Sequence, residues 1–150
     1  MSDNYLRLFP TDRTWLPTSE QADRAVATLR VLAPSAQEIA AEVYGMVTFI
    51  DQGANLERIG CPACHAELDL EWWSEQMARR DEHDFVTLDV EAPCCGAATT
   101  LDDLVYDWPA GFASVELSVL NPDRSWLSAD ELNTVAAAVG HPLRQVMAHY

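Results

Sequence analysis

The stretch Cys61-Pro-Ala-Cys64 decides how the middle of this chain folds, because two thiolates spaced by two residues in a tight turn can reach one metal ion. A second pair, Cys94 and Cys95, follows after 29 intervening residues and precedes Gly96. Both pairs come directly after segments that we expect to be strands, as in the two knuckles of a zinc ribbon. The spacing therefore predicts one structural zinc ion held by Cys61, Cys64, Cys94 and Cys95 in a closed tetrahedral shell.

The second cysteine pair departs from the ribbon pattern. A ribbon knuckle reads Cys-x-x-Cys-Gly, but here Ala92 stands three residues before Cys95, and Cys94 lies directly beside it. Adjacent cysteines can both bind a metal where the backbone bends between them. His65 or His83 is the alternative fourth ligand, and the sequence leaves this choice open.

Three other chemistries use similar residues. Cys61-Pro-Ala-Cys64-His65 matches the pattern of c-type haem attachment, which would leave the second cysteine pair unexplained. A thiol oxidoreductase also uses Cys-x-x-Cys, but its low thiol pKa depends on a helix that begins at the motif, and here the helical pattern starts near Asp69. A metal-dependent hydrolase would need paired histidines, and the chain has no His-Glu-x-x-His. The oxidoreductase and the hydrolase stay as alternatives to a non-enzymatic protein.

The chain is strongly acidic, with 24 carboxylates against nine arginines and no lysine, a net charge of −15. Residues 67–107 carry twelve of the carboxylates and only two of the arginines. Such a field repels nucleic-acid phosphate and attracts basic surfaces. It favours an adaptor, inhibitor or immunity-type protein that binds a basic protein and no nucleic acid. A solvated face that only maintains solubility is the simpler interpretation.

Length and composition suit one globular domain, with 150 residues of which 49% are hydrophobic. The longest apolar stretch is Val43-Tyr-Gly-Met-Val-Thr-Phe-Ile50, which is too short to span a bilayer, so we expect no membrane contact. The N-terminus lacks a basic start followed by an apolar segment, which predicts a cytoplasmic location. In that reducing compartment, four cysteines are metal ligands more often than disulfides. The sequence does not indicate an oligomeric state.

Apolar periodicity and capping signals predict alternating strands and helices. The expected strands are 5–9, 38–50 with a hairpin bend at Gly45, 56–59, 85–91 and 112–120. The expected helices are 18–32, 69–80, 101–106, 128–139 and 141–150. This order predicts one α+β domain over residues 1–150, with an antiparallel or mixed sheet and helices on one face. A ferredoxin-like sheet is the specific form that we expect, with a zinc-ribbon-like segment at about 55–105 inserted in it.

Six stretches spread over nearly the whole chain form a recognisable set. They are Asn4-Tyr-Leu-Arg-Leu-Phe-Pro-Thr-Asp12, Cys61-Pro-Ala-Cys64, Glu71-Trp-Trp73, Pro93-Cys-Cys-Gly96, Tyr106-Asp-Trp-Pro-Ala-Gly-Phe112 and Pro142-Leu-Arg-Gln145. The set resembles a family of small bacterial proteins with a zinc-ribbon-like site, some of which are labelled sugar transporter ATPases. That label does not suit this chain, which has no Gly-x-x-x-x-Gly-Lys-Ser/Thr and no lysine to complete one. The resemblance implies a zinc site and no activity.

Overall fold

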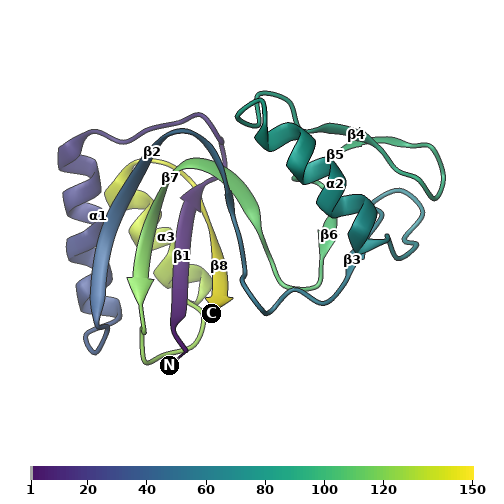
Figure 1. Cartoon of the computed structure of the whole chain (residues 1–150). Helices are drawn as coiled ribbons and strands as arrows, with labels where there is room; N and C mark the ends of the chain where they lie inside the picture. The colour runs from purple at the N-terminus through teal and green to yellow at the C-terminus, as the bar shows by residue number, and fades with distance from the viewer. Residues whose placement is uncertain (1) are drawn as a thin grey trace. The chain divides into compact units, whose positions relative to one another are not determined.

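The computed structural model describes residues 2–150, which form two compact units (Figure 1). Unit 1 comprises the residues up to Asn55 together with Pro109–Tyr150, and unit 2 is the intervening segment Leu56–Trp108. Within the described residues, three helices, an antiparallel sheet of four strands and two small sheets confirm the predicted α+β class.

Unit 1 is built on the four-stranded sheet. Its strands run in the order β2-β7-β1-β8, and every neighbouring pair is antiparallel. The elements of the unit, in chain order, are β1 (Asn4–Pro10), α1 (Ser19–Leu32), β2 (Glu38–Ile50), β7 (Gly111–Leu120), α3 (Ala129–Val139) and β8 (Leu143–His149). β1, α1, β7 and α3 confirm predicted elements, whereas β2 covers a predicted strand segment but differs from it in form.

Both helices of unit 1 cover the same face of the sheet. Leu6 and Leu8 alternate with Arg7 along β1, so the two leucines point to one face and Arg7 points to the other. The leucine face is buried against α1 and α3 in one apolar cluster that includes Leu29 and Val135. Full burial of a side chain the size of Leu29 contributes about 1.5–3 kcal/mol, so this cluster is the main stabilising feature of the unit.

The two helices begin and end at the residues that the capping signals indicate. Thr18 and Ser128 each form a capping box at the start of a helix. Gly140 ends α3 with a left-handed backbone, φ +84°. The left-handed conformation favours glycine at this position, and a Cβ there would also lie 2.7 Å from Nε2 of Gln21, whose side chain would have to move.

The prediction of a last helix over residues 141–150 is wrong. Leu143–His149 forms β8, which pairs with the whole length of β1. A helix here would leave the N–H and C=O groups along one edge of β1 without partners, and pairing with β8 satisfies them. Leu143, Val146 and Ala148 are buried in the strand, and this packing outweighs the helical propensity of the segment.

The segment 38–50 is one strand rather than a hairpin bent at Gly45. β2 pairs with β7 along its length, with a register shift between Val43 and Thr48. Gly45 lies inside the shifted stretch and has φ +73°. The glycine therefore allows a bulge, after which the strand continues in the same direction.

Unit 2 consists of short elements around one helix. These are β3 (Ile59–Gly60) paired with β6 (Val105–Tyr106), β4 (Asp89–Glu91) paired with β5 (Ala98–Thr100), and α2 (Leu70–Asp81). The helix agrees with the predicted helix at 69–80, and the side chain of its N-cap, Asp69, accepts a hydrogen bond from the N–H of Glu71.

The prediction of a strand over 85–91 is correct only in its second half. Phe85 is buried and has φ +51°, whereas Val86 is 77% exposed. The N–H of Phe85 donates to the carbonyl of Arg80 at the end of α2 (2.8 Å). Termination of the helix thus directs Phe85 inward and interrupts the alternation that the sequence suggests.

Two other predicted elements of unit 2 also differ. The strand at 56–59 is reduced to Ile59–Gly60, and the helix at 101–106 is a turn that leads into β6. The hydroxyl of Thr100 accepts a hydrogen bond from the N–H of Asp103 (3.2 Å), as an N-cap would. The chain then pairs with β3 instead of continuing as a helix, so the capping signal marks a single turn.

Candidate metal centre

The first cysteine pair lies in a tight turn after β3. The N–H of Cys61 donates to the carbonyl of Ala66 (2.9 Å), and the N–H of His65 donates to the carbonyl of Cys61 (3.0 Å). His65 has a left-handed backbone, φ +64°. These bonds close residues 61–66 into a loop in which the sulfurs of Cys61 and Cys64 lie within 4.8 Å of each other.

The second turn repeats the backbone pattern of the first. The N–H of Ala92 donates to the carbonyl of Ala97 (2.9 Å), and the N–H of Gly96 donates to the carbonyl of Ala92 (2.8 Å), with Gly96 at φ +73°. The residues of the two turns correspond in order: Cys61 with Ala92, Ala63 with Cys94, Cys64 with Cys95, and His65 with Gly96. An alanine thus fills the first ligand position of the second turn. Cys94 presents the additional sulfur from a position that holds alanine in the first turn.

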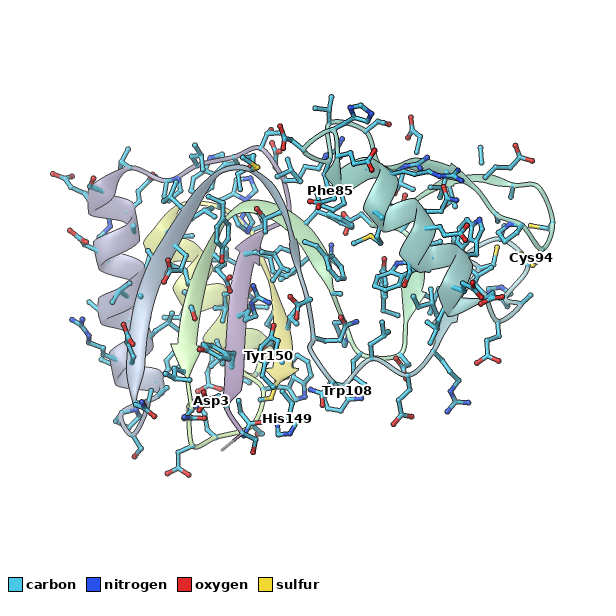
Figure 2. All side chains as sticks on the ribbon, in the orientation of Figure 1. Asp3, Phe85, Cys94, Trp108, His149 and Tyr150 are labelled. Carbon is cyan, nitrogen blue, oxygen red and sulfur yellow. The ribbon has the colours of Figure 1, made fainter. Side chains whose placement is uncertain are left out.

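All four sulfurs come together in unit 2. Each Sγ lies within 4.8 Å of the other three, with 3.9 Å between Cys61 and Cys95 and 3.3 Å between Cys64 and Cys94. Metal–sulfur bonds of about 2.3 Å in a tetrahedron place the sulfurs roughly 3.8 Å apart, so this cluster could hold one metal ion. Figure 2 shows Cys94 beside other sulfur atoms at this place in the unit.

The histidines lie outside the sulfur cluster. Among residues 2–150, the group of potential ligands at this place contains the four cysteines and neither His65 nor His83. The side chain of His65 instead lines a surface pocket together with Arg58 and Asp107. The geometry therefore favours Cys94 over either histidine as the fourth ligand.

Protons are shared unequally among the thiols. The backbone N–H of Cys64 donates to the sulfur of Cys61 and lowers the pKa of that thiol to about 7. The hydrogen bond between the side chains of Cys94 and Cys64 raises the pKa of Cys94 to about 12. A metal binds thiolates, so it displaces the protons that Cys94 and its neighbours would otherwise keep.

Negative charge is concentrated on unit 2. The segment Leu56–Trp108 contains thirteen carboxylates and three arginines, a net charge of −10, whereas the rest of the chain has a net charge of −5. All of the thirteen except Asp102 are exposed to solvent. The charge of this unit is therefore presented outward.

Sequence reasoning missed a polar cluster on the helix-free face of the unit 1 sheet. Arg7 and Glu116 form an ion pair of 2.6 Å there and are nearly fully buried. The hydroxyl of Tyr44 donates to Glu116, and the hydroxyl of Tyr150 accepts from Arg7. Each charged residue interrupts an apolar strand, Leu6-Arg-Leu in β1 and Val115-Glu-Leu in β7, and this pattern could have marked each position as unusual.

Comparison with known proteins adds no further assignment. No family model, no curated protein and no solved structure matches the chain. In the described part of the chain, no helix has the length and apolar character needed to cross a membrane. The site must therefore be interpreted from its own chemistry.

Proposed function

We propose that the chain is an acidic, non-enzymatic zinc-binding protein that acts by binding a basic protein partner, as an adaptor, inhibitor or immunity-type protein. The observation that carries the proposal is the gathering of four sulfurs within 4.8 Å in the most acidic part of the chain. Four sulfur ligands complete a tetrahedron and leave no position for a water or substrate, so the ion would be structural. A hydrolytic metal site is disfavoured for the same reason.

We also propose a specific fold for each unit, a ferredoxin-like sheet for unit 1 and a zinc-ribbon-like segment for unit 2. The element order β-α-β-β-α-β of unit 1 and its strand order β2-β7-β1-β8 support a ferredoxin-like sheet. The two equivalent turns at 61–66 and 92–97 support a zinc-ribbon-like segment placed between the second and third strands of that sheet.

Zinc is the metal that the donor set suits best. Thiolate ligands in a tetrahedron select zinc or iron among biological metals. A closed site of four cysteines, in which no histidine is a ligand, is typical of structural zinc. Protein purified under reducing conditions without chelator should contain about one zinc per chain. If the protein contained iron instead, the four-cysteine metal site would stand but its identity as a zinc site would be wrong. Protein without bound metal would contradict the proposal.

The partner is proposed from charge. An exposed net charge of −10 over 53 residues attracts a basic surface and raises the rate of association at low salt. The same charge disfavours nucleic acid, whose phosphates it would repel. The protein should therefore retain a basic protein in a way that weakens as ionic strength rises.

A matched pair of double variants tests where that partner binds. Glu71→Gln with Glu75→Gln removes two exposed charges from α2, and Glu20→Gln with Asp23→Asn removes two from the corresponding part of α1. The α2 variant should weaken retention of the partner several-fold, whereas the α1 variant should change it little. Equal effects, or retention that is indifferent to salt, would count against binding through unit 2.

A thiol oxidoreductase is the second candidate, because the pKa of Cys61 is lowered to about 7 beside Cys64. Against it, Cys61 is buried, and α2 begins only at Leu70, so no helix N-terminus meets the motif. Alkylation kinetics discriminate the two functions. A redox pair would react fast at one thiol in protein as purified, whereas a zinc site would protect all four thiols until a chelator is added.

A further inference from the structure

The buried ion pair of unit 1 is held in place by hydrogen bonds to several neighbours. Nε and Nη2 of Arg7 donate to the two carboxylate oxygens of Glu116 (2.7 and 2.6 Å). Nη1 of Arg7 donates to the carbonyl of Asp51 (2.9 Å) and to the hydroxyl of Tyr150 (3.2 Å), and it lies 3.3 Å from the Asp51 carboxylate. Tyr44 donates its hydroxyl to Glu116. All three nitrogens of this guanidinium therefore already donate to neighbouring groups.

Stability alone does not account for this arrangement. A buried ion pair usually stabilises a fold no better than apolar side chains of similar volume would. The opposite face of β1 and β7 shows that this sheet can bury apolar side chains in a row, such as Leu6, Leu8 and Leu117. Charged and hydroxyl-bearing groups on the helix-free face are therefore better explained as the floor of a binding site.

A pocket of about 370 Å³ lies over this ion pair. Besides Arg7 and Glu116, three tyrosines, two carboxylates and a serine line it: Tyr5, Tyr44, Tyr150, Asp3, Glu42 and Ser118. Tyr5 and Tyr150 meet edge to face with ring centroids 5.8 Å apart. Figure 2 shows Asp3 and Tyr150 toward the same end of the sheet. Aromatic rings and carboxylates thus surround one cavity.

The charge and ring content of the pocket select a cation. Arg7 is already neutralised by Glu116 and Asp51, so two further carboxylates of the lining, Asp3 and Glu42, carry charge that the arginine does not offset. Glu42 is exposed, and among residues 2–150 it has no cationic partner that would compete with a ligand. Tyrosine rings attract cations at their faces and also cover apolar stems.

We propose that this pocket binds an alkylguanidinium or alkylammonium group. Such a group would place its charge near Glu42 and Asp3 and its methylene stem against the tyrosine rings. The inference does not rest on the metal centre or on the partner proposed for unit 2, because all the residues involved belong to unit 1. The group could come from a free amine or from an arginine or lysine side chain of another protein.

Titration followed by backbone amide chemical shifts tests the proposal on the whole, metal-loaded chain. The probes are agmatine, as a free amine, and the blocked tripeptide Gly-Arg-Gly, as a side chain in a peptide; Gly-citrulline-Gly is the uncharged control. Saturating shifts at pocket residues with the charged probes, and none with citrulline, are the expected result. Response to agmatine alone would assign a small-molecule source, and response to the peptide alone would assign a protein source.

Two charge variants make the test specific. Glu42→Gln should weaken binding of the charged probes roughly threefold, because it removes one partly solvated ion pair. Glu38→Gln changes the same charge on the same strand but lies outside the pocket lining, and it should leave binding nearly unchanged. Equal weakening by both variants, equal shifts with the citrulline peptide, or the absence of saturable shifts with either charged probe would overturn the proposal.

Discussion

The two units reach an ordered structure by different means. Unit 1 has four paired strands of seven to thirteen residues, and both of its helices bury side chains in a common apolar cluster. Unit 2 has strands of two or three residues, and α2 has no fully buried residue. A segment of 53 residues with so little regular structure is of the size at which small domains commonly use a cross-link or a metal for stability. Unit 2 does bury apolar side chains such as Ile59, Leu88 and Leu101, but its regular structure is short. We therefore expect unit 1 to depend on its core and unit 2 to depend also on a metal held by its sulfurs.

Removal of the metal should have the largest effect, and it should be confined to unit 2. Binding of structural zinc by small four-ligand sites is worth roughly 10–16 kcal/mol at neutral pH, and most of that energy is coupled to folding. Cys61→Ser, or chelation of the wild-type protein, should abolish zinc binding. The amide signals of residues 56–108 should then lose their chemical-shift dispersion, as in an unfolded segment. Metal analysis and two-dimensional NMR measure both effects. Signals of α3 and the four-stranded sheet should persist.

Loss of the folded unit 1 signals in the same experiment would contradict the expectation that the metal stabilises unit 2 alone. It would mean that the metal stabilises the whole chain rather than unit 2. Ala63→Ser is a suitable control, because it adds a hydroxyl in the same turn without removing a sulfur. This variant should keep its zinc and its spectrum.

Cys94→Ser should have the next largest effect, because it removes the sulfur with no equivalent in the first turn. If Cys94 is a ligand, the variant should lose most of its zinc affinity, by a factor comparable to that of Cys95→Ser. His65→Gly is the matched control in the other turn. Glycine suits the left-handed backbone at φ +64°, so this variant should keep its zinc and lose no stability. Full zinc content in Cys94→Ser with loss in His65→Gly would make His65 the fourth ligand.

Local patterns predict much of this structure, and pairings distant in sequence account for most of the errors. The capping boxes at Thr18 and Ser128 mark α1 and α3 because each is complete within four residues. β8 was missed because its conformation depends on the edge of β1, more than 130 residues earlier. In unit 2, residues 85–88 have the sequence pattern of a strand but do not form one, because Phe85 takes part in the turn that ends α2.

The candidate site shows the same contrast. Cysteine spacing is a local signal, and it suffices to nominate all four sulfurs that the structure gathers. The same spacing shows that Cys94 departs from the regular position, but it leaves open whether Cys94 or a histidine is the fourth ligand, and that choice depends on how the two turns come together in space. The Arg7–Glu116 pair joins residues 109 positions apart, so neither residue identifies the other in the sequence.

Breaking that ion pair should destabilise unit 1 while leaving the metal in place. Glu116→Gln leaves the guanidinium of Arg7 buried without its main counter-charge, which costs about 3 kcal/mol in the free energy of unfolding. Glu42→Gln is the matched control, since Glu42 pairs with Glu116 in the register of β2 and β7 but is exposed. It should change stability by less than about 0.5 kcal/mol. Chemical denaturation followed through unit 1 signals, with zinc content measured in parallel, separates these outcomes.

A smaller effect is expected at the start of α3. The hydroxyl of Ser128 accepts a hydrogen bond from the N–H of Glu131 (3.1 Å). Ser128→Ala removes this acceptor and should lower the free energy of unfolding by about 1 kcal/mol. Thr18→Ala should have a similar effect at α1, because the cap has the same form. Neither variant should alter zinc content. A change in metal affinity would show that the helices of unit 1 influence the metal turns.

The smallest effect concerns the acid stability of unit 1. A hydrogen-bonded ion pair with Arg124 lowers the pKa of Glu131 to about 2, from an ordinary value of 4.5. A carboxylate whose pKa is depressed by folding stabilises the protein fully above its unfolded pKa and loses that contribution as pH falls toward the folded pKa. Glu131→Gln should therefore reduce the dependence of unit 1 stability on pH between about 4.5 and 2. Denaturation curves of wild type and variant at several pH values in that window measure the difference, and the metal, which acid releases from both proteins, cancels from the comparison. Identical slopes would mean that the pair is too solvated to contribute.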